Sequence, residues 1–386
     1  MTTWSVVKDD DTRQKRRREL TPRIALLACL ALVVVSLGIA FSPGSPKEPA
    51  EPPFSEQARS AALTETMRLR AAGEELARPT GGDGQPAVAR TVSLLTSQAR
   101  ALLVPGQDGE DSPPAPGSPP PAAPSASPSA AATTAPLPAT AAALATELAA
   151  SASQRLADAA VADGGMARLL AAVGTAQLLQ ASSLAAAAGA PAPAAPEPAA
   201  PQLSGACPSA PASQSSSASP SSSRAAASAG QDTGAATLPG ALAAAVRTEL
   251  EAVYGYQVAL TRLGGDAAAS ASQQLARHEA LAADAETLSR MHCAVAPARE
   301  AGYTMAPAFL AAPAAGLGGL EASALTVYGD LVALSEGQTR QWAISGLVGA
   351  ARRSALWGAE TGVLPGLAAD PAEFPELPAP TLSPAP

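Results

Sequence analysis

Aromatic residues are scarce in this sequence, at 3% of the chain, although 47% of its residues are hydrophobic. Its apolar content is therefore dominated by alanine, which buries little area at the usual ~25 cal/mol per Å². This argues against one large core. With 38 prolines and long Ala, Ser and Pro tracts, much of the chain cannot pack at all, so we expect modest helical modules joined by linkers.

Histidine and cysteine are also rare: the whole chain has two histidines and three cysteines. No zinc-ligand spacing and no Cys-x-x-Cys motif is present, and neither is a nucleophile elbow or a phosphate-binding glycine loop. The sequence therefore lacks the usual signs of an enzyme.

Charge is unevenly distributed along the chain. Residues 1–23 carry seven Lys/Arg and four Asp/Glu, which gives +3, so the remaining 18 Lys/Arg and 29 Asp/Glu give residues 24–386 a charge of -11. An acidic bulk argues against nucleic acid as a partner and against docking onto anionic lipid. The same charge could serve only to keep an alanine-rich protein soluble.

The run Ile24–Phe41 has no charged residue and is just long enough, at ~1.5 Å per residue, to cross a hydrocarbon core of ~30 Å. The basic tail 1–23 precedes it, so the positive-inside rule places the N-terminus in the cytoplasm and the bulk outside, in a single-pass protein of the cell membrane. A signal peptide cleaved after Gly38-Ile39-Ala40 and a lipobox ending at Cys29 are alternatives. Each of them also exports the remainder.

Helical patterns and low-complexity tracts alternate after a short linker, residues 42–53. We expect helical hairpins at 54–104 and 139–189, separated by a Pro-rich disordered spacer, 105–138. The two hairpins could close into one small bundle, or each could need a partner to bury its apolar face. A disordered Pro/Ala/Ser linker, 190–237, follows them.

The C-terminal part of the sequence predicts a four-helix bundle at 238–367, before a disordered tail at 368–386. The predicted fold class is therefore all-α. The four expected helices are Leu238–Leu263, Asp266–His292, Leu317–Ser335 and about Gln338–Gly358, with a proline-punctuated loop at Val295–Gly316.

Several short motifs stand out in this module: the run from Glu249 to Tyr256, Arg277-His278, the loop from Gly302 to Pro307, and Trp342 with Arg352, Arg353 and Trp357. Together they resemble an actinobacterial ferritin-like domain of unknown function. The resemblance covers about a third of the chain and implies a ferritin-like bundle in an exported protein, without an established activity.

A di-iron centre of the ferritin-like type needs a Glu from each of two helices and an i, i+3 Glu/His pair from each of the other two. The standard set is absent here, because Leu275 and Ser289 stand three residues before His278 and His292. The cofactor therefore stays unknown, and a metal ion remains possible.

Glu249 lies on the apolar stripe of its helix, where an unpaired carboxylate would be costly, so it should have a partner. His278 is the candidate, and Glu249 and His278 could bind one metal ion with Glu279 or Glu321 adding oxygen ligands. Alternatively Glu249 forms a structural pair with His278, with Arg352 or Arg353, or with a Tyr hydroxyl. The large aromatic residues are expected to fill the core: Tyr254, Tyr256, Trp342 and Trp357.

Cys29 falls inside the predicted membrane span, which leaves Cys207 and Cys293 as the exterior cysteines. Disulfides persist outside the cytoplasm, so we expect these two to pair and to pin the linker onto the loop after the second helix of the bundle. Closing that loop could add on the order of 4 kcal/mol of stability.

These features together predict a membrane-anchored envelope protein with a non-enzymatic binding or scaffold role. Its expected partners are the membrane, through residues 24–41, and an envelope protein or cell-wall component that the sequence does not identify. The alternative is a metal-binding or oxidoreductase ferritin-like protein that uses Glu249 and His278.

Overall fold

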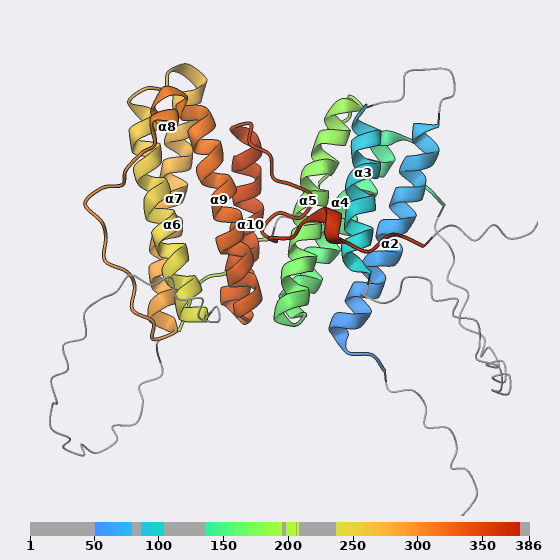
Figure 1. Cartoon of the computed structure of the whole chain (residues 1–386), viewed down its shortest axis with the longest axis horizontal. Coiled ribbons are helices and arrows are strands. Elements are labelled where there is room, and N and C mark those ends of the chain that lie inside the picture. The colour runs from blue at the N-terminus through green and yellow to red at the C-terminus, as the bar shows by residue number, and fades with distance from the viewer. Residues whose placement is uncertain are drawn as a thin grey trace, which may run out of the picture. The chain divides into compact units, whose positions relative to one another are not determined.

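A computed structural model describes residues 51–78, 86–103, 136–194, 198–205, 207 and 237–378 (Figure 1). The predicted membrane span and most of the predicted spacers lie outside these residues. In the described part the structure is all-helical, as expected, and contains no strand. The helices are α2 (Phe54–Ala77), α3 (Pro86–Leu102), α4 (Ala141–Val161), α5 (Gly164–Ala187), α6 (Leu238–Leu260), α7 (Gly265–Met291), α8 (Pro307–Ala311), α9 (Pro313–Leu334), α10 (Gly337–Leu356) and a 3-10 helix, η1 (Pro371–Glu373).

Side-chain caps fix where several helices begin. Thr140 accepts a hydrogen bond from the backbone N–H of Ala143 (3.1 Å), and Asp163 accepts one from Met166 (3.1 Å). Each cap satisfies a backbone donor that the first turn of a helix leaves without a partner. The abrupt turn between α4 and α5 follows from the second cap.

The loop expected at Val295–Gly316 is partly helical. Pro307 begins α8 and Pro313 begins α9, so α9 starts four residues before the predicted Leu317. Proline is favoured at the first position of a helix, where its missing N–H would have no partner and its fixed φ suits the helix. Two of the prolines that we interpreted as loop signals, Pro307 and Pro313, are therefore helix starts.

The first four helices pack as two antiparallel pairs, α2 with α3 and α4 with α5, and α2 also contacts α4. Their interior is mostly leucine and alanine, and its largest members are fully buried: Leu69, Leu95, Leu144, Leu148 and Leu184. The hairpins thus cover part of each other's apolar face.

The helices α6, α7, α9 and α10 stand side by side in the second half (Figure 1), with direct contacts between α6 and α7, α6 and α9, and α9 and α10. Gly346 of α10 lies against the ring of Tyr328 of α9, where a Cβ would clash. Glycine here lets the two helices approach each other closely.

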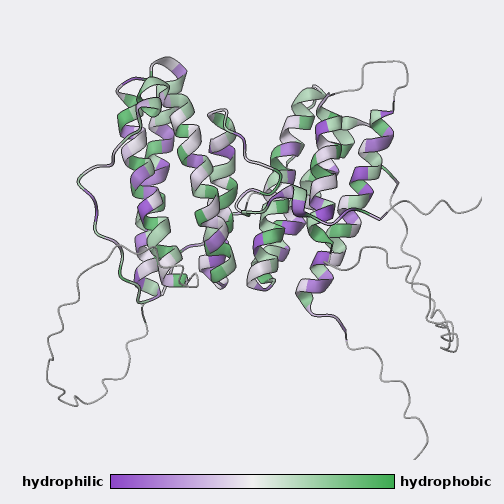
Figure 2. Ribbon diagram, in the orientation of Figure 1, coloured by the Kyte–Doolittle hydropathy of each residue, from purple (hydrophilic) through white to green (hydrophobic). Residues whose placement is uncertain are grey.

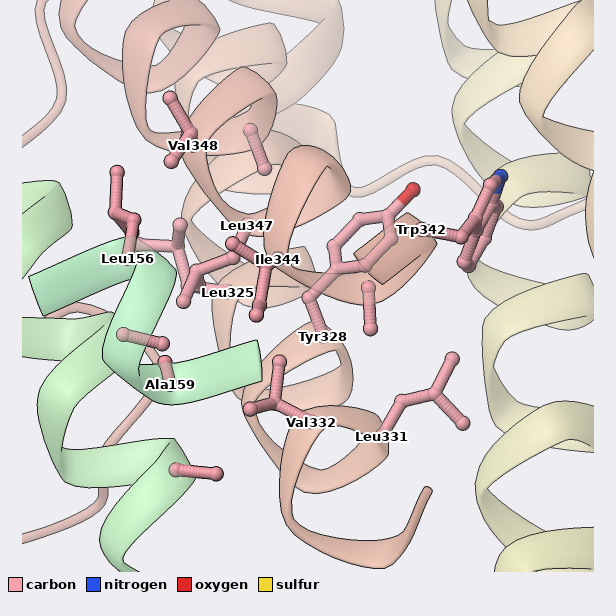
Figure 3. Packing of buried hydrophobic residues seen from close by; sticks show 14 of the residues in the cluster. Leu156, Ala159, Leu325, Tyr328, Leu331, Val332, Trp342, Ile344, Leu347 and Val348 are labelled. Carbon is pink, nitrogen blue, oxygen red and sulfur yellow. The ribbon is translucent and has the colours of Figure 1, made fainter. Parts of the chain in front are cut away.

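One hydrophobic cluster joins the two halves. Leu156 and Ala159 of α4 lie beside Leu325, Val332 and Ile344 of α9 and α10 (Figure 3). At the same contact Arg340 donates hydrogen bonds to the carbonyl oxygens of Val332 and Ala162. The sequence left open whether the two hairpins form one bundle or need a partner. In the structure they pack on each other and also on α9 and α10.

Two segments expected to be disordered make specific contacts where the structure describes them. In the linker, Leu203 packs against the core, and the N–H of Ser204 donates to Gln338 (3.2 Å). In the tail, Arg100 of α3 donates to the carbonyl oxygens of Phe374 (2.6 Å) and Pro375 (2.9 Å). Extended chain of this kind has no periodic pattern from which these contacts could be predicted.

Two of the described helices, α5 and α9, are long and apolar enough to cross a membrane by length and composition. Their most apolar windows are 67% and 50% buried inside the fold, as is usual for core helices. The long helices of the described part carry both hydrophilic and hydrophobic residues (Figure 2). The span expected at residues 24–41 lies outside the described part.

Candidate functional site

A cluster of polar and charged side chains occupies the interior between α6, α7, α9 and α10, and all four helices contribute to it. Every member is at most 6% exposed. We call this set the buried network: Glu249 and Tyr256 from α6, His278 from α7, Glu321 and Tyr328 from α9, and Arg353 from α10.

His278 is the centre of the buried network. Its Nδ1 lies 2.8 Å from Oε2 of Glu249, and its Nε2 lies 2.8 Å from Oε1 of Glu321. An ionised carboxylate can only accept hydrogen bonds, so each ring nitrogen must carry a proton to bond both acids. The geometry therefore favours a positively charged imidazolium between two carboxylates.

Three further side chains donate to the two carboxylates. The hydroxyl of Tyr328 donates to Oε1 of Glu249 (2.6 Å), and that of Tyr256 donates to Oε1 of Glu321 (2.7 Å). Nε of Arg353 donates to Oε2 of Glu321 (2.9 Å). Two acids, one imidazolium and one guanidinium thus balance in charge, which is the condition under which buried charges are tolerated.

The titration of these groups follows from their contacts. Burial lowers the pKa of His278, but hydrogen bonds to Glu249 and Glu321 outweigh it and raise that pKa above its ordinary value. Burial raises the pKa of Glu321, yet the hydrogen bond from His278 and the charge of Arg353 bring it below the ordinary value. For Tyr256 and Tyr328, burial and the adjacent carboxylates both raise the pKa, so the hydroxyls stay protonated as donors.

Comparison with known families places the buried network in a recognised domain. Residues 241–369 match the family model described as Domain of unknown function (DUF4439). The match covers 129 of the 386 residues and includes every member of the buried network. No curated protein and no solved structure matches the chain.

Within the DUF4439 domain, the structure brings together the two site residues that the sequence singled out, Glu249 and His278. Glu321 joins them, whereas Glu279 lies exposed on α7 and takes no part. Arg353 bonds Glu321 rather than Glu249. Sequence analysis offered a Tyr hydroxyl as one possible partner of Glu249 but did not identify Tyr328, because the pattern of a helix does not show which tyrosine hydroxyl is bonded.

Of the aromatic residues expected to fill the core of the DUF4439 domain, Tyr256 and Trp342 are almost fully buried, whereas Tyr254 and Trp357 are partly exposed. Tyr256 combines both roles, since its ring stacks near His278, with centroids 4.9 Å apart, while its hydroxyl bonds Glu321. The indole N–H of Trp357 donates to the same hydroxyl (2.8 Å). Trp357 therefore extends the hydrogen bonds of the buried network toward the end of α10.

The donor set does not suit a metal ion as it is arranged. A histidine binds metal through an unprotonated ring nitrogen, and here both nitrogens of His278 face carboxylate oxygens at hydrogen-bond distance. Among the described residues, no group of three or more His, Cys, Asp or Glu side chains is placed to hold a metal. The chemistry that the buried network supports is charge pairing and the retention of one proton on His278.

A disulfide joins Cys207 to Cys293, the pair expected from the sequence, with their Cα atoms 5.2 Å apart. Cys293 follows the end of α7 and has a positive φ of 55°. The bond ties the linker that follows α5 to the DUF4439 domain.

Proposed function

We propose that the protein is a membrane-anchored, extracytoplasmic envelope protein, and that its C-terminal domain is a ferritin-like bundle with a non-enzymatic binding or scaffold role. The apolar run at residues 24–41, after a basic tail, supports the anchor and its orientation. The Cys207–Cys293 disulfide supports an exterior location, because cytosolic thiols are kept reduced. The ferritin-like assignment rests on four helices that converge on central carboxylates and a histidine.

One observation carries the non-enzymatic role. At the position where a ferritin-like enzyme would bind metal, the carboxylates of Glu249 and Glu321 are taken up by protein donors from the surrounding helices. Such a centre locks the register of the helices and leaves no ligand position open. The binding or scaffold role then depends on the surfaces of the domain and on its position outside the membrane.

The rival function is metal binding or redox chemistry through Glu249 and His278. The convergence of two acids and a histidine from three helices favours it, provided that a metal displaces the proton on His278. The two functions differ in whether the purified protein contains stoichiometric metal.

Elemental analysis of the full chain, purified with and without iron, manganese or zinc, separates the two functions. The variants are Glu249→Gln, in the buried network, and Glu279→Gln, an exposed control one residue from His278. We expect no stoichiometric metal in any of the three proteins. Metal that is bound by the wild type and the control but lost in Glu249→Gln would establish the rival function.

The exterior location has its own test, because the two bridged cysteines report on the compartment. In protein taken from cells without reductant, we expect Cys207 and Cys293 to resist a thiol reagent until the disulfide is reduced. Free thiols at both positions in freshly isolated protein would contradict an exterior location.

A further inference from the structure

A groove of about 760 Å³ runs between α7 and α10, and Pro198 of the linker borders it. Its volume lies in the range of small-molecule sites, roughly 300–1,000 Å³. The buried network lies on its inner side, since Arg353 belongs both to that network and to the groove wall. None of the functions considered above uses this groove.

Arginine side chains gather along the groove. Three arginines are among its described lining residues, Arg277, Arg352 and Arg353, and none of those lining residues is acidic. This contrasts with a chain whose net charge is -8. Arg277 is exposed and makes no hydrogen bond or ion pair with any described residue, so its guanidinium is available to a ligand.

Arg353 supplies a second, independent sign of a ligand. The residue is 6% exposed, and its buried Nη2 has no hydrogen-bond partner among the described residues. A buried donor without an acceptor is costly. An oxygen atom bound in the groove would meet the same guanidinium through Nη1, which lies beside Gly349 of the groove wall.

The backbone of α10 also leaves room beside this guanidinium. Gly349 lines the groove, and a Cβ at that position would lie 3.0 Å from Nη1 of Arg353. A larger residue would press on the guanidinium from the groove side.

The other part of the wall is apolar. Leu281 and Val348 are almost fully buried along the groove, whereas Leu356 lines it with 55% of its surface exposed. A large exposed leucine next to arginines forms a surface with separate places for charge and for hydrocarbon. Water can hydrogen-bond the guanidinium groups but gains nothing from contact with the leucine side chain.

We propose that this groove binds a small amphiphilic oxyanion, a phosphate or carboxylate attached to a short apolar group. Arg277 and Arg353 bind the oxyanion, because a guanidinium fork matches both head groups in geometry and charge. The apolar group lies against Leu281, Val348 and Leu356. This inference deepens the proposed binding role by naming the class of ligand, and in that sense it rests on that role.

Calorimetric titration of the full chain in a non-ionic detergent tests the proposal, with hexyl phosphate, hexanoate, inorganic phosphate and hexylammonium as probes at fixed ionic strength. We expect hexyl phosphate or hexanoate to bind, inorganic phosphate to bind more weakly, and hexylammonium not to bind. The tighter of the two hexyl anions identifies the head group. Failure of both hexyl anions to bind at millimolar concentration would overturn the proposal.

Two arginine variants of α7 locate the binding. Arg277→Gln removes one charge-assisted contact, worth about 1.5–3 kcal/mol, and should weaken binding about tenfold or more. Arg290→Gln removes the same charge from an exposed position on the same helix, outside the groove, where Arg290 donates to Thr287 and to no other described side chain. Arg290→Gln should change the affinity by less than about twofold. Equal losses in the two variants would mean charge attraction without a site and would refute the proposal.

A variant of the apolar wall checks the second half of the ligand. Leu356→Gln should weaken hexyl phosphate severalfold and leave inorganic phosphate unchanged, because only the hexyl chain contacts that leucine. A loss for both probes would contradict the proposed orientation. Neither metal content nor thiol state depends on the groove, so a metal-free, exterior protein that binds none of these anions would disprove this inference alone.

Discussion

The residue with the most consequence is His278, because both of its ring nitrogens face acids in an interior that water does not reach. Charged residues are seldom buried unless they are paired, and here each charge has an opposite partner at hydrogen-bond distance. The stability of the buried network should therefore depend on the proton that His278 holds.

The first prediction concerns pH. Since the folded state raises the pKa of His278, it binds a proton more tightly than the unfolded chain, whose histidine titrates near ~6.5. The stabilisation is complete below that pH and is lost as pH rises through the folded pKa, and the free energy of unfolding falls by about 1.4 kcal/mol per pH unit within this window. Urea unfolding of the full chain between pH 6 and 10 measures the slope.

Histidine variants provide the control for this slope. His278→Gln should remove it, whereas His292→Gln should keep it, because His292 hydrogen-bonds the hydroxyl of Thr339 (2.8 Å) and pairs with no acid among the described residues. Parallel pH profiles for the wild type and His278→Gln would show that the slope has another origin.

The second prediction concerns Glu321, which accepts bonds from Tyr256 and Arg353 and faces His278. Glu321→Gln leaves two buried cations with one acid and should cost about 3–5 kcal/mol of unfolding free energy. Glu279→Gln, at an exposed position, should change it by less than about 0.5 kcal/mol. Denaturant unfolding at neutral pH compares the two, and similar small effects would mean that the buried network contributes little to stability.

At this scale the sequence predicted part of the site. An acid on an apolar stripe must have a partner, and that argument identified Glu249 and His278. It did not identify Tyr328, or the pairing of Arg353 with Glu321, because helical periodicity gives the face of a residue but not its height relative to neighbouring helices. Which residue of α9 meets Glu249 of α6 depends on how the helices pack.

At the scale of elements, helix positions were predicted to within a few residues where the apolar pattern is periodic, as at α6 and α7. The predicted start of α9 was wrong, because a proline is found both in loops and in the first turn of a helix. Close helix contacts were not foreseen, because a glycine within a helical pattern shows nothing of what lies opposite it.

The third prediction tests such a contact. Gly346→Ala places a methyl group against the ring of Tyr328, whose hydroxyl is held by Glu249, so the variant should lose about 1–3 kcal/mol of stability. Gly319→Ala is the matched control on α9, where nothing lies within 4 Å of the added methyl group. Because alanine favours the helix over glycine, the control should gain about 0.5–1 kcal/mol. Thermal unfolding of both variants measures the difference, and equal shifts would exclude a tight contact between α9 and α10.

At the scale of the whole molecule, the N-terminal hairpins and the DUF4439 domain share one hydrophobic cluster. The sequence could not decide this, because alanine-rich faces suit many partners and carry little information about which one they meet. It did predict that the linker would be tied down at Cys207 and Cys293.

The fourth prediction concerns that disulfide. Its cysteines are 86 residues apart in sequence, and the chain-entropy relation for a loop of that length gives about 4–5 kcal/mol. Cys207→Ser with Cys293→Ser should therefore lower the free energy of unfolding by up to about that amount, as should reduction of the wild type. Unfolding curves with and without dithiothreitol measure it. A wild type that is insensitive to the reductant, and equal in stability to the double variant, would count against the bond.

The same disulfide changes how the molecule responds to a cut in its backbone. Residues 208–236, which include Arg224, lie between the two bridged cysteines, so they belong to a covalent ring. A protease that cleaves at Arg224 opens this ring without separating the two pieces, which run as one species on a gel until a reductant divides them. The connection between the N-terminal helices and the DUF4439 domain is therefore made twice, once by peptide bonds and once by sulfur.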